Sequence, residues 1–286
     1  MRQDQHIVPQ VYLKQFGYLR DKQWKISSLE REKVHIMDKI NKLFFSQKSI
    51  VSVTAHENIF DLNYELPENV KLLEKLHGRI EDLYLELIED INTERQLSGR
   101  SKAILVQLIP NLISRSYDYR EFLNKCLNSK TRDRFLASLT TFHEDKGDSF
   151  IDKLNLLPIE EHLNPVSLIA MEHIMNKLAY FNYAFIKQYN DRYWITSDQP
   201  VVLTNCVNPN SIFSIDTELY FPVSRDYLIF MYHPNSISDN PLRRLKNESF
   251  NNCSEEIQEM IYKEIWRNAH ELVFFPYEIN EKTTLK

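Results

Sequence analysis

Residues 70–91 read VKLLEKLHGRIEDLYLELIEDI, and this stretch decides how the middle of the chain folds. Its apolar side chains recur at intervals of three or four residues: Val70, Leu73, Leu76, Ile80, Leu83, Leu87 and Ile91. This spacing places them along one face of an α-helix, which turns once in about 3.6 residues. Pro67 and Glu68 stand just before the stretch, and both residue types are favoured in the first turn of a helix. The stretch therefore predicts a long amphipathic helix.

Further helices are expected on the C-terminal side of this stretch. Residues 101–116, SKAILVQLIPNLISRS, are apolar nearly all round, which predicts a buried helix with a kink at Pro110. Asn164 and Pro165 suit the cap and first turn of a helix that runs to about residue 179. Shorter helical pieces are expected around 118–128, 130–142 and 148–156. Residues 66–180 are thus predicted to form a helical region.

The two flanking parts of the chain are rich in β-branched and aromatic residues, which favour strands. On the N-terminal side, strands are expected at 24–29 and 49–54. On the C-terminal side they are expected at 181–187, 193–196, 201–204, 218–222, 227–232 and 271–275, with one helix from Ser254 to about residue 268. We therefore predict a single α+β domain over 1–286. Its helical region packs on a mostly antiparallel sheet formed by the strand-rich regions 1–65 and 181–286.

The composition excludes several classes of protein. With 43% apolar and 26% charged residues, the chain suits a globular protein and not a disordered one. No apolar run approaches the roughly 18 residues of a membrane span, and the start, MRQDQHIVPQ, lacks the apolar core of a signal peptide. We therefore expect no membrane association and a cytoplasmic location. Cys126, Cys206 and Cys253 lie far apart, which favours free thiols over a disulfide framework or a zinc motif.

Glycine is scarce, since the whole chain has only Gly17, Gly78, Gly99 and Gly147. Phosphate-binding loops, dinucleotide fingerprints and nucleophile elbows all need glycines where the backbone approaches a ligand or takes a positive φ. No nucleotide cofactor is therefore expected.

Charge is unevenly distributed along a chain whose net charge is −5. Residues 100–134 carry three acidic side chains, Asp118, Glu121 and Asp133, against eight basic ones: Arg100, Lys102, Arg115, Arg120, Lys125, Lys130, Arg132 and Arg134. This basic segment could hold a phosphate-bearing partner such as a nucleic acid or a nucleotide. The alternative is an ordinary solvated helix face.

Two short segments carry polar side chains that packing does not require. In the first, residues 6–14 (HIVPQVYLK), Pro9 stiffens a bend that His6 and Gln10 flank. In the second, residues 194–200 (WITSDQP), Ser197 and Asp198 stand at a strand end, a usual position for residues that project from a rigid scaffold. We expect the two segments to be neighbours in space.

Three stretches, HIVPQVYLKQF (6–16), YWITSDQPVV (193–202) and IDTELYFPVSRDYLIF (215–230), together resemble the bacterial and phage family known as domain of unknown function 4238. The family pattern is His-x-x-Pro-x-x-Tyr-Leu-x-x-Phe, then Thr-Ser-Asp-x-Pro-Val, then Phe-Pro-Leu-Ser. The chain departs from the last element, because Val223 replaces the leucine. The resemblance also implies two glutamates seven residues apart on a long helix, Glu74 and Glu81, and an arginine pair, Arg115 and Arg120.

These residues make up the candidate site. The predicted catalytic residues are His6, Gln10, Glu81 and Asp198, and the predicted substrate-binding residues are Tyr12, Lys14, Arg115, Arg120 and Ser197. A divalent ion, Mg²⁺ or Mn²⁺, is expected at Asp198 and Glu81. The alternatives are structural: His6 bonds a backbone carbonyl, Asp198 bonds backbone amides, and Glu74 or Glu81 forms an ion pair with Arg115 or Arg120 across two packed helices.

Two functions fit this set of residues. The first is a metal-assisted phosphodiester hydrolase, similar to a nuclease, in phage or mobile-element conflict. The second is a non-catalytic binding module that recognises a nucleotide, a peptide or a partner protein. Convergence of an imidazole, two carboxylates and an arginine would favour the enzyme, and a broad apolar surface would favour the binding module.

Overall fold

A computed structural model of the chain describes residues 4–34, 45–63, 65, 69–93, 99–140, 147–204 and 215–276. Pro67, Glu68 and Cys206, which entered the predictions above, lie outside these residues. The protein belongs to the α+β class, as predicted: helices and mostly antiparallel strands occupy separate regions of the chain.

The central sheet consists of strands from the C-terminal half, in the order β11-β6-β10-β9-β8. Their bounds are β6 Asn182–Lys187, β8 Val202–Thr204, β9 Glu218–Pro222, β10 Tyr227–Tyr232 and β11 Phe250–Asn252. Neighbouring strands are antiparallel except β11 and β6, which are parallel. Every residue of β9 and β10 is buried, so this sheet is covered on both faces.

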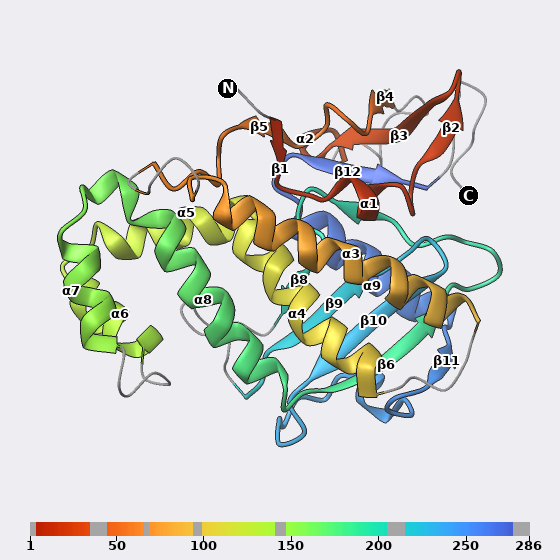
Figure 1. Ribbon diagram of the computed structural model, residues 1–286. Coiled ribbons are helices and arrows are strands. Elements are labelled where there is room, and N and C mark those ends of the chain that lie inside the picture. Colours follow the sequence, from red (N-terminus) through yellow and green to blue (C-terminus); the bar gives the residue numbers. More distant parts are fainter. Residues whose placement is uncertain are drawn as a thin grey trace.

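Helices cover the two faces of the central sheet (Figure 1). On one face lie α4 (Gly99–Arg115) and α8 (Leu163–Leu178), whose apolar side chains share one core cluster with Phe185 and Ile229 of the sheet. On the other face lies α9 (Glu255–Asn268), which packs on Ile186, Leu228 and Phe230. Neighbouring residues of β6, such as Phe185 and Ile186, pack against different helices because successive side chains of a strand point to opposite faces.

The long helix predicted from residues 70–91 is α3 (Leu72–Asn92), and it packs against α4. The stripe residues Leu73, Ile80, Leu87 and Ile91 are buried, which confirms the periodicity argument. The short helices α5 (Tyr117–Leu127), α6 (Arg132–Thr140) and α7 (Gly147–Asn155) follow α4, as expected. Pro110 lies inside α4 and is buried.

A second sheet joins the two ends of the chain, with β2 (Tyr18–Arg20), β3 (Gln23–Glu30), β12 (Leu272–Phe275) and β7 (Thr196–Ser197) in that order. Strand β4 (Ser46–Ser49) pairs with β3, and a separate ladder pairs β1 (Asp4–His6) with β5 (Ala55–Glu57). The helices α1 (Gln10–Leu13) and α2 (Arg31–Val34) connect these strands. The single sheet that we predicted is therefore divided into two sheets and a ladder.

Two predicted strands differ from the structure. Residues 50–54 do not extend, because Ser52 and Val53 donate backbone hydrogen bonds back to Ser49 and form a turn. Residues 193–196 do not pair with β6 as a hairpin. The backbone takes a left-handed turn at Asn190 and Asp191, and the chain then leaves the central sheet to form β7 beside β12.

None of the helices in the described ranges combines the length and apolar content that a membrane crossing needs.

Candidate functional site

Arg115 is the centre of a polar cluster between α3, α4 and β1. It is the last residue of α4 and only 1% exposed. Its Nη1 donates to the Glu81 carboxylate, and its Nη2 donates to the backbone carbonyl of His6. The predicted ion pair across two packed helices is therefore confirmed for Glu81 and Arg115. A buried guanidinium needs such partners, so Arg115 fixes the end of β1 against α3.

Aromatic and imidazole rings complete the buried side of this cluster. The Phe60 ring lies 5.0 Å from the Arg115 guanidinium carbon and 5.3 Å from that of Arg120. His77, one turn from Glu74 and Glu81 on the same helix, contacts Phe60 edge-on and donates from Nδ1 to Asn111. Burial, with the nearby Arg115 charge, lowers the pKa of His77 well below its ordinary value. This imidazole is consequently neutral.

The two glutamates of α3 lie in different environments although they share one helix face. Glu81 is paired with Arg115. Glu74 is half-buried, and its buried Oε2 atom has no hydrogen-bond partner among the described residues. Burial raises the pKa of the Glu74 carboxyl, the Glu81 charge raises it further, and the Arg115, His6 and Lys71 charges oppose these effects. The Glu74 carboxyl is thus biased toward its protonated form, and a carboxyl of raised pKa is typical of acid–base sites.

His6 ends β1 and is partly exposed. Its Nε2 lies 2.8 Å from the carbonyl oxygen of Val51 and 3.2 Å from Nε2 of Gln10. A carbonyl oxygen can only accept, so the bond to Val51 requires a proton on Nε2. In the neutral ring Nδ1 is then the atom that can accept a proton. The structural alternative for His6, a bond to a backbone carbonyl, is present, and no described residue bonds the other ring nitrogen, Nδ1.

In the second polar segment, residues 194–200, the polar side chains bond backbone groups of the protein. Both Asp198 carboxylate oxygens accept backbone N–H groups: Oδ1 from His270 at 2.9 Å, and Oδ2 from Glu271 at 2.8 Å and Leu272 at 2.9 Å. Ser197 Oγ donates to the Gln199 carbonyl at 2.8 Å. Burial raises the pKa of Asp198, against the three N–H groups that lower it. Asp198 and Ser197 are buried, so in this structure they join β7 to the start of β12 and do not face solvent.

Tyr12 joins the two segments. Its hydroxyl lies 2.5 Å from Thr196 Oγ1 and donates to the Pro222 carbonyl at 2.8 Å. The Tyr12 ring stacks on Phe221, with the ring centres 5.6 Å apart. Burial raises the pKa of this phenol well above its ordinary value, so the group stays neutral. The two segments therefore meet through the side chains of Tyr12 and Thr196.

Sequence reasoning missed a cluster of rings at the surface, formed by His56 of β5, Tyr117 of α5 and His270. His56 Nε2 and the Tyr117 hydroxyl share a hydrogen bond, and Tyr117 stacks on His270 with ring centres 4.7 Å apart. His270 Nδ1 lies 3.2 Å from the Asp118 carboxylate. These residues stand far apart in sequence and follow no common spacing, so no local pattern predicts that they meet.

The ring cluster is electrostatically coupled to its surroundings. Burial lowers the pKa of His56, and the nearby His6 and Arg120 charges lower it further, whereas Glu271 opposes them. Burial, with the Asp198 and Glu271 charges, raises the pKa of Tyr117 to about 12. His6 and His56 thus lie within electrostatic reach of each other.

Of the predicted substrate-binding residues, one is exposed to solvent and four are buried. Lys14 is exposed at the end of α1, whereas Tyr12, Ser197, Arg115 and Arg120 are buried. Arg120 donates to the Ile59 carbonyl at 3.2 Å and to Asn164 Oδ1 at 3.0 Å. Burial and the nearby Arg115 charge lower its pKa to about 10. These four buried side chains hold the site together and, in this arrangement, do not reach a substrate in solvent.

The basic segment offers fewer open cations than its sequence suggests. Arg115 and Arg120 are buried. Arg100, Lys125 and Arg132 form ion pairs with Glu86, Glu121 and Asp133. The charges that would attract a long polyanion are therefore largely internal or compensated.

The divalent ion expected at Asp198 and Glu81 stays a prediction. Both carboxylates are already engaged, one by three backbone N–H groups and the other by Arg115. Within the described ranges, no three His, Cys, Asp or Glu side chains are grouped in a way that could hold a metal ion. Metal binding at these two residues would require them to give up their present partners.

Comparisons with known proteins identify the family of this chain. No curated protein and no solved structure matches the chain. The family described as "Protein of unknown function (DUF4238)" matches residues 4–277, a range that includes both polar segments, the two glutamates of α3 and the two arginines. The chain therefore belongs to the DUF4238 family of proteins of unknown function.

Proposed function

We propose that the protein is a phosphodiester hydrolase that uses Glu74 and His6 as acid–base groups. The observation that carries this proposal is the environment of Glu74: a half-buried carboxyl of raised pKa beside the Glu81–Arg115 ion pair and the His6 imidazole. Glu74 lies within electrostatic reach of Glu81, Arg115 and His6, and this set supports an acid–base role. Asp198, the other carboxylate expected from the sequence, is engaged by backbone N–H groups and is not part of the set.

The roles of the residues follow from their protonation. Glu74 in its protonated form can donate a proton to a leaving oxygen, and His6 can accept one from water at Nδ1. Arg115 acts as a positioning residue, because it holds the His6 carbonyl and fixes the charge of Glu81 near Glu74. The Gln10 amide lies against the His6 ring, 3.2 Å from Nε2; with Nε2 protonated, this contact is not a hydrogen bond from the amide nitrogen.

The charge distribution favours a small phosphodiester over a long strand. Most cations of the basic segment are buried or paired, whereas Lys14 of the first polar segment is exposed. A small diester needs only one or two local cations, but a long strand is held by many.

The test is hydrolysis of bis(p-nitrophenyl) phosphate, with p-nitrophenyl phosphate as the monoester control. We expect Glu74→Gln and His6→Ala to lower kcat by about 100-fold or more, in line with the loss of a general acid or base. Glu86→Gln is the matched control: the same substitution on the same helix, at a glutamate that pairs with exposed Arg100. The rate should also fall as pH rises above the raised pKa of Glu74, and Glu74→Gln should remove this dependence. Absence of diesterase activity in the parent protein, or equal activity of Glu74→Gln, would refute the proposal.

Non-catalytic binding is the second candidate function. It is favoured by an apolar pocket of about 480 Å³ at the beginning of α3 and α8. This pocket is lined by residues other than the acid–base groups.

A further inference from the structure

The apolar pocket lies where three helices meet. Its walls are formed by Leu72 and Leu76 of α3, Phe150 of α7, and Leu168 and Ile169 of α8, with Leu62 from the preceding loop. Its volume of about 480 Å³ lies within the usual range of small-molecule sites. Leu72 is 53% exposed, so the pocket is open to solvent on the side of α3. A cavity of this size suits a small, largely apolar ligand.

Positive charge borders this pocket. Lys75 and Arg79 line it, lie one turn apart on α3 and are exposed. Neither side chain has a hydrogen bond or an ion pair within the part of the chain that the structure describes. Among the described residues that line the pocket, Glu65 is the acidic one, so these three charges sum to +1.

Two helix beginnings add to this charge. The first residues of α3 and the Asn164-Pro165 pair at the start of α8 both line the pocket. Neither helix has a side chain that caps its first N–H groups. The positive ends of two helix dipoles therefore lie at the edge of an apolar cavity that two cations already border.

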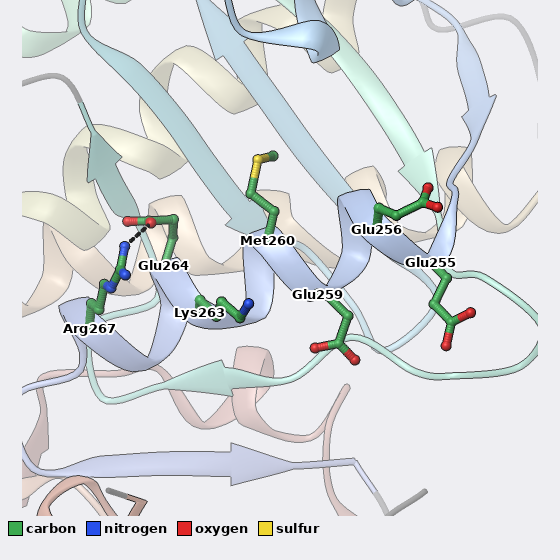
Figure 2. A pocket seen from close by; sticks show the side chains of 7 residues that line it. All are labelled: Glu255, Glu256, Glu259, Met260, Lys263, Glu264 and Arg267. Atoms are coloured by element: carbon green, nitrogen blue, oxygen red, sulfur yellow. Dashed lines mark hydrogen bonds and ion pairs between the residues drawn. The ribbon is translucent and has the colours of Figure 1, made fainter.

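Helix α9 carries a comparable pair of cations whose positive charge is compensated by nearby acidic side chains. Lys263 and Arg267 of α9 have the same residue types and the same spacing of four. Figure 2 shows them among Glu255, Glu256, Glu259 and Glu264, with Arg267 paired to Glu264. There the cations are compensated by acids. At the apolar pocket they outnumber the single acid.

We propose that the pocket binds a single-chain amphiphile with a carboxylate head, of the class of medium-chain fatty acids. The apolar chain lies among the leucines, Phe150 and Ile169, and the carboxylate lies toward Lys75, Arg79 and the two helix beginnings. Asn164, which lines the pocket, also accepts from Arg120 and donates to the carbonyls of Ile59 and Asp61. The ligand is thus expected to stabilise the fold, because it touches a residue that holds the Phe60 segment in place.

The experiment is isothermal titration calorimetry of the intact protein with decanoate, and with decylamine and 1-decanol as probes of the same chain length. We expect decanoate to bind at one site, and decylamine to bind at least about tenfold more weakly. The double variant Lys75→Glu/Arg79→Glu should weaken decanoate binding by about tenfold or more and leave 1-decanol binding unchanged. The matched control, Lys263→Glu/Arg267→Glu, changes the same residue types on α9 and should bind decanoate like the parent.

A pocket-filling variant, Ile169→Trp, tests the location. Ile169 is partly exposed, so the indole can occupy the cavity without replacing a fully buried side chain. We expect this variant to keep its Tm and to lose binding of both decanoate and 1-decanol. Absence of decanoate binding by the parent would overturn the proposal. So would unchanged binding by Ile169→Trp, or equal binding of decylamine and decanoate. The proposal is independent of the acid–base site, because binding is measured without any reaction.

Discussion

The two proline-containing segments, residues 6–14 and 194–200, have the same character in sequence and opposite roles in the structure. In the first, His6 and Gln10 remain partly exposed, and Nδ1 of His6 has no hydrogen bond to the described part of the chain. In the second, Ser197 and Asp198 are buried, and the carboxylate accepts three backbone N–H groups. Polar side chains beside a proline therefore do not identify a reactive site. The difference arises from how many backbone donors the surrounding fold leaves to be satisfied.

The largest effect should come from the second segment. Asp198→Ala would leave the N–H groups of His270, Glu271 and Leu272 without their acceptor, at a cost of about 3–5 kcal/mol in the free energy of unfolding. Tm should fall by roughly 10 °C, measured by calorimetry. His6→Ala is the comparison from the first segment and should change Tm by less than about 2 °C, because its ring is partly exposed. Equal Tm values for the two variants would break the contrast between the segments.

We expect an intermediate loss of stability when Arg115 is replaced, because its side chain bonds the backbone of the first segment at His6. Arg115→Ala would remove the partner of Glu81, the donor to the His6 carbonyl and the packing on Phe60. We expect a loss of about 3 kcal/mol in denaturant unfolding. Arg100→Ala serves as the control, because its ion pair with Glu86 is exposed and screened by solvent, so its loss should change the unfolding curve far less. If both arginines proved equally dispensable, Arg115 would not be the residue that positions His6.

The smallest effect concerns Glu74 and has a defined pH dependence. Its folded-state pKa is raised, so its contribution to stability is present below the ordinary value of 4.5 and is lost as pH rises through the raised pKa. Near pH 7 the ionised carboxylate is therefore unfavourable, and Glu74→Gln should raise Tm by about 1–2 °C. This difference should disappear below about pH 4.5. A variant less stable than the parent at pH 7, in thermal melts across pH 4–8, would contradict the raised pKa and with it the acid role of Glu74.

Local patterns in the sequence were sufficient for most of the secondary structure. The stripe of residues 70–91 predicted α3, and the strands predicted at 218–222 and 227–232 matched β9 and β10 at both ends. These predictions succeeded because they rest on local signals, an apolar period for the helix and aromatic and β-branched content for the strands. Residues 50–54 failed because β-branched composition favours a strand but does not supply a pairing partner, and here the backbone bonds to itself in a turn.

The candidate site was predicted in part. The family resemblance singled out the members of its arginine–glutamate pair, and an inward carboxylate needs a partner when two helices pack. The ring cluster of His56, Tyr117 and His270 did not follow, because its members lie on β5, on α5 and ahead of β12. The sequence also did not predict that Glu81, and not Glu74, pairs with Arg115. This choice depends on which of the two positions on α3 the Arg115 side chain reaches.

The sequence by itself determined the α+β class, the helical middle region, most strand positions and the short set of polar residues that deserve mutation. Only the tertiary structure decided which of those residues are open to solvent. Tyr12 reaches Thr196 and Pro222, 184 and 210 residues away, and Asp198 reaches the backbone of His270. The physical reason is that burial and hydrogen-bond satisfaction are properties of a site assembled from distant segments, whereas periodicity is a property of neighbours along the chain.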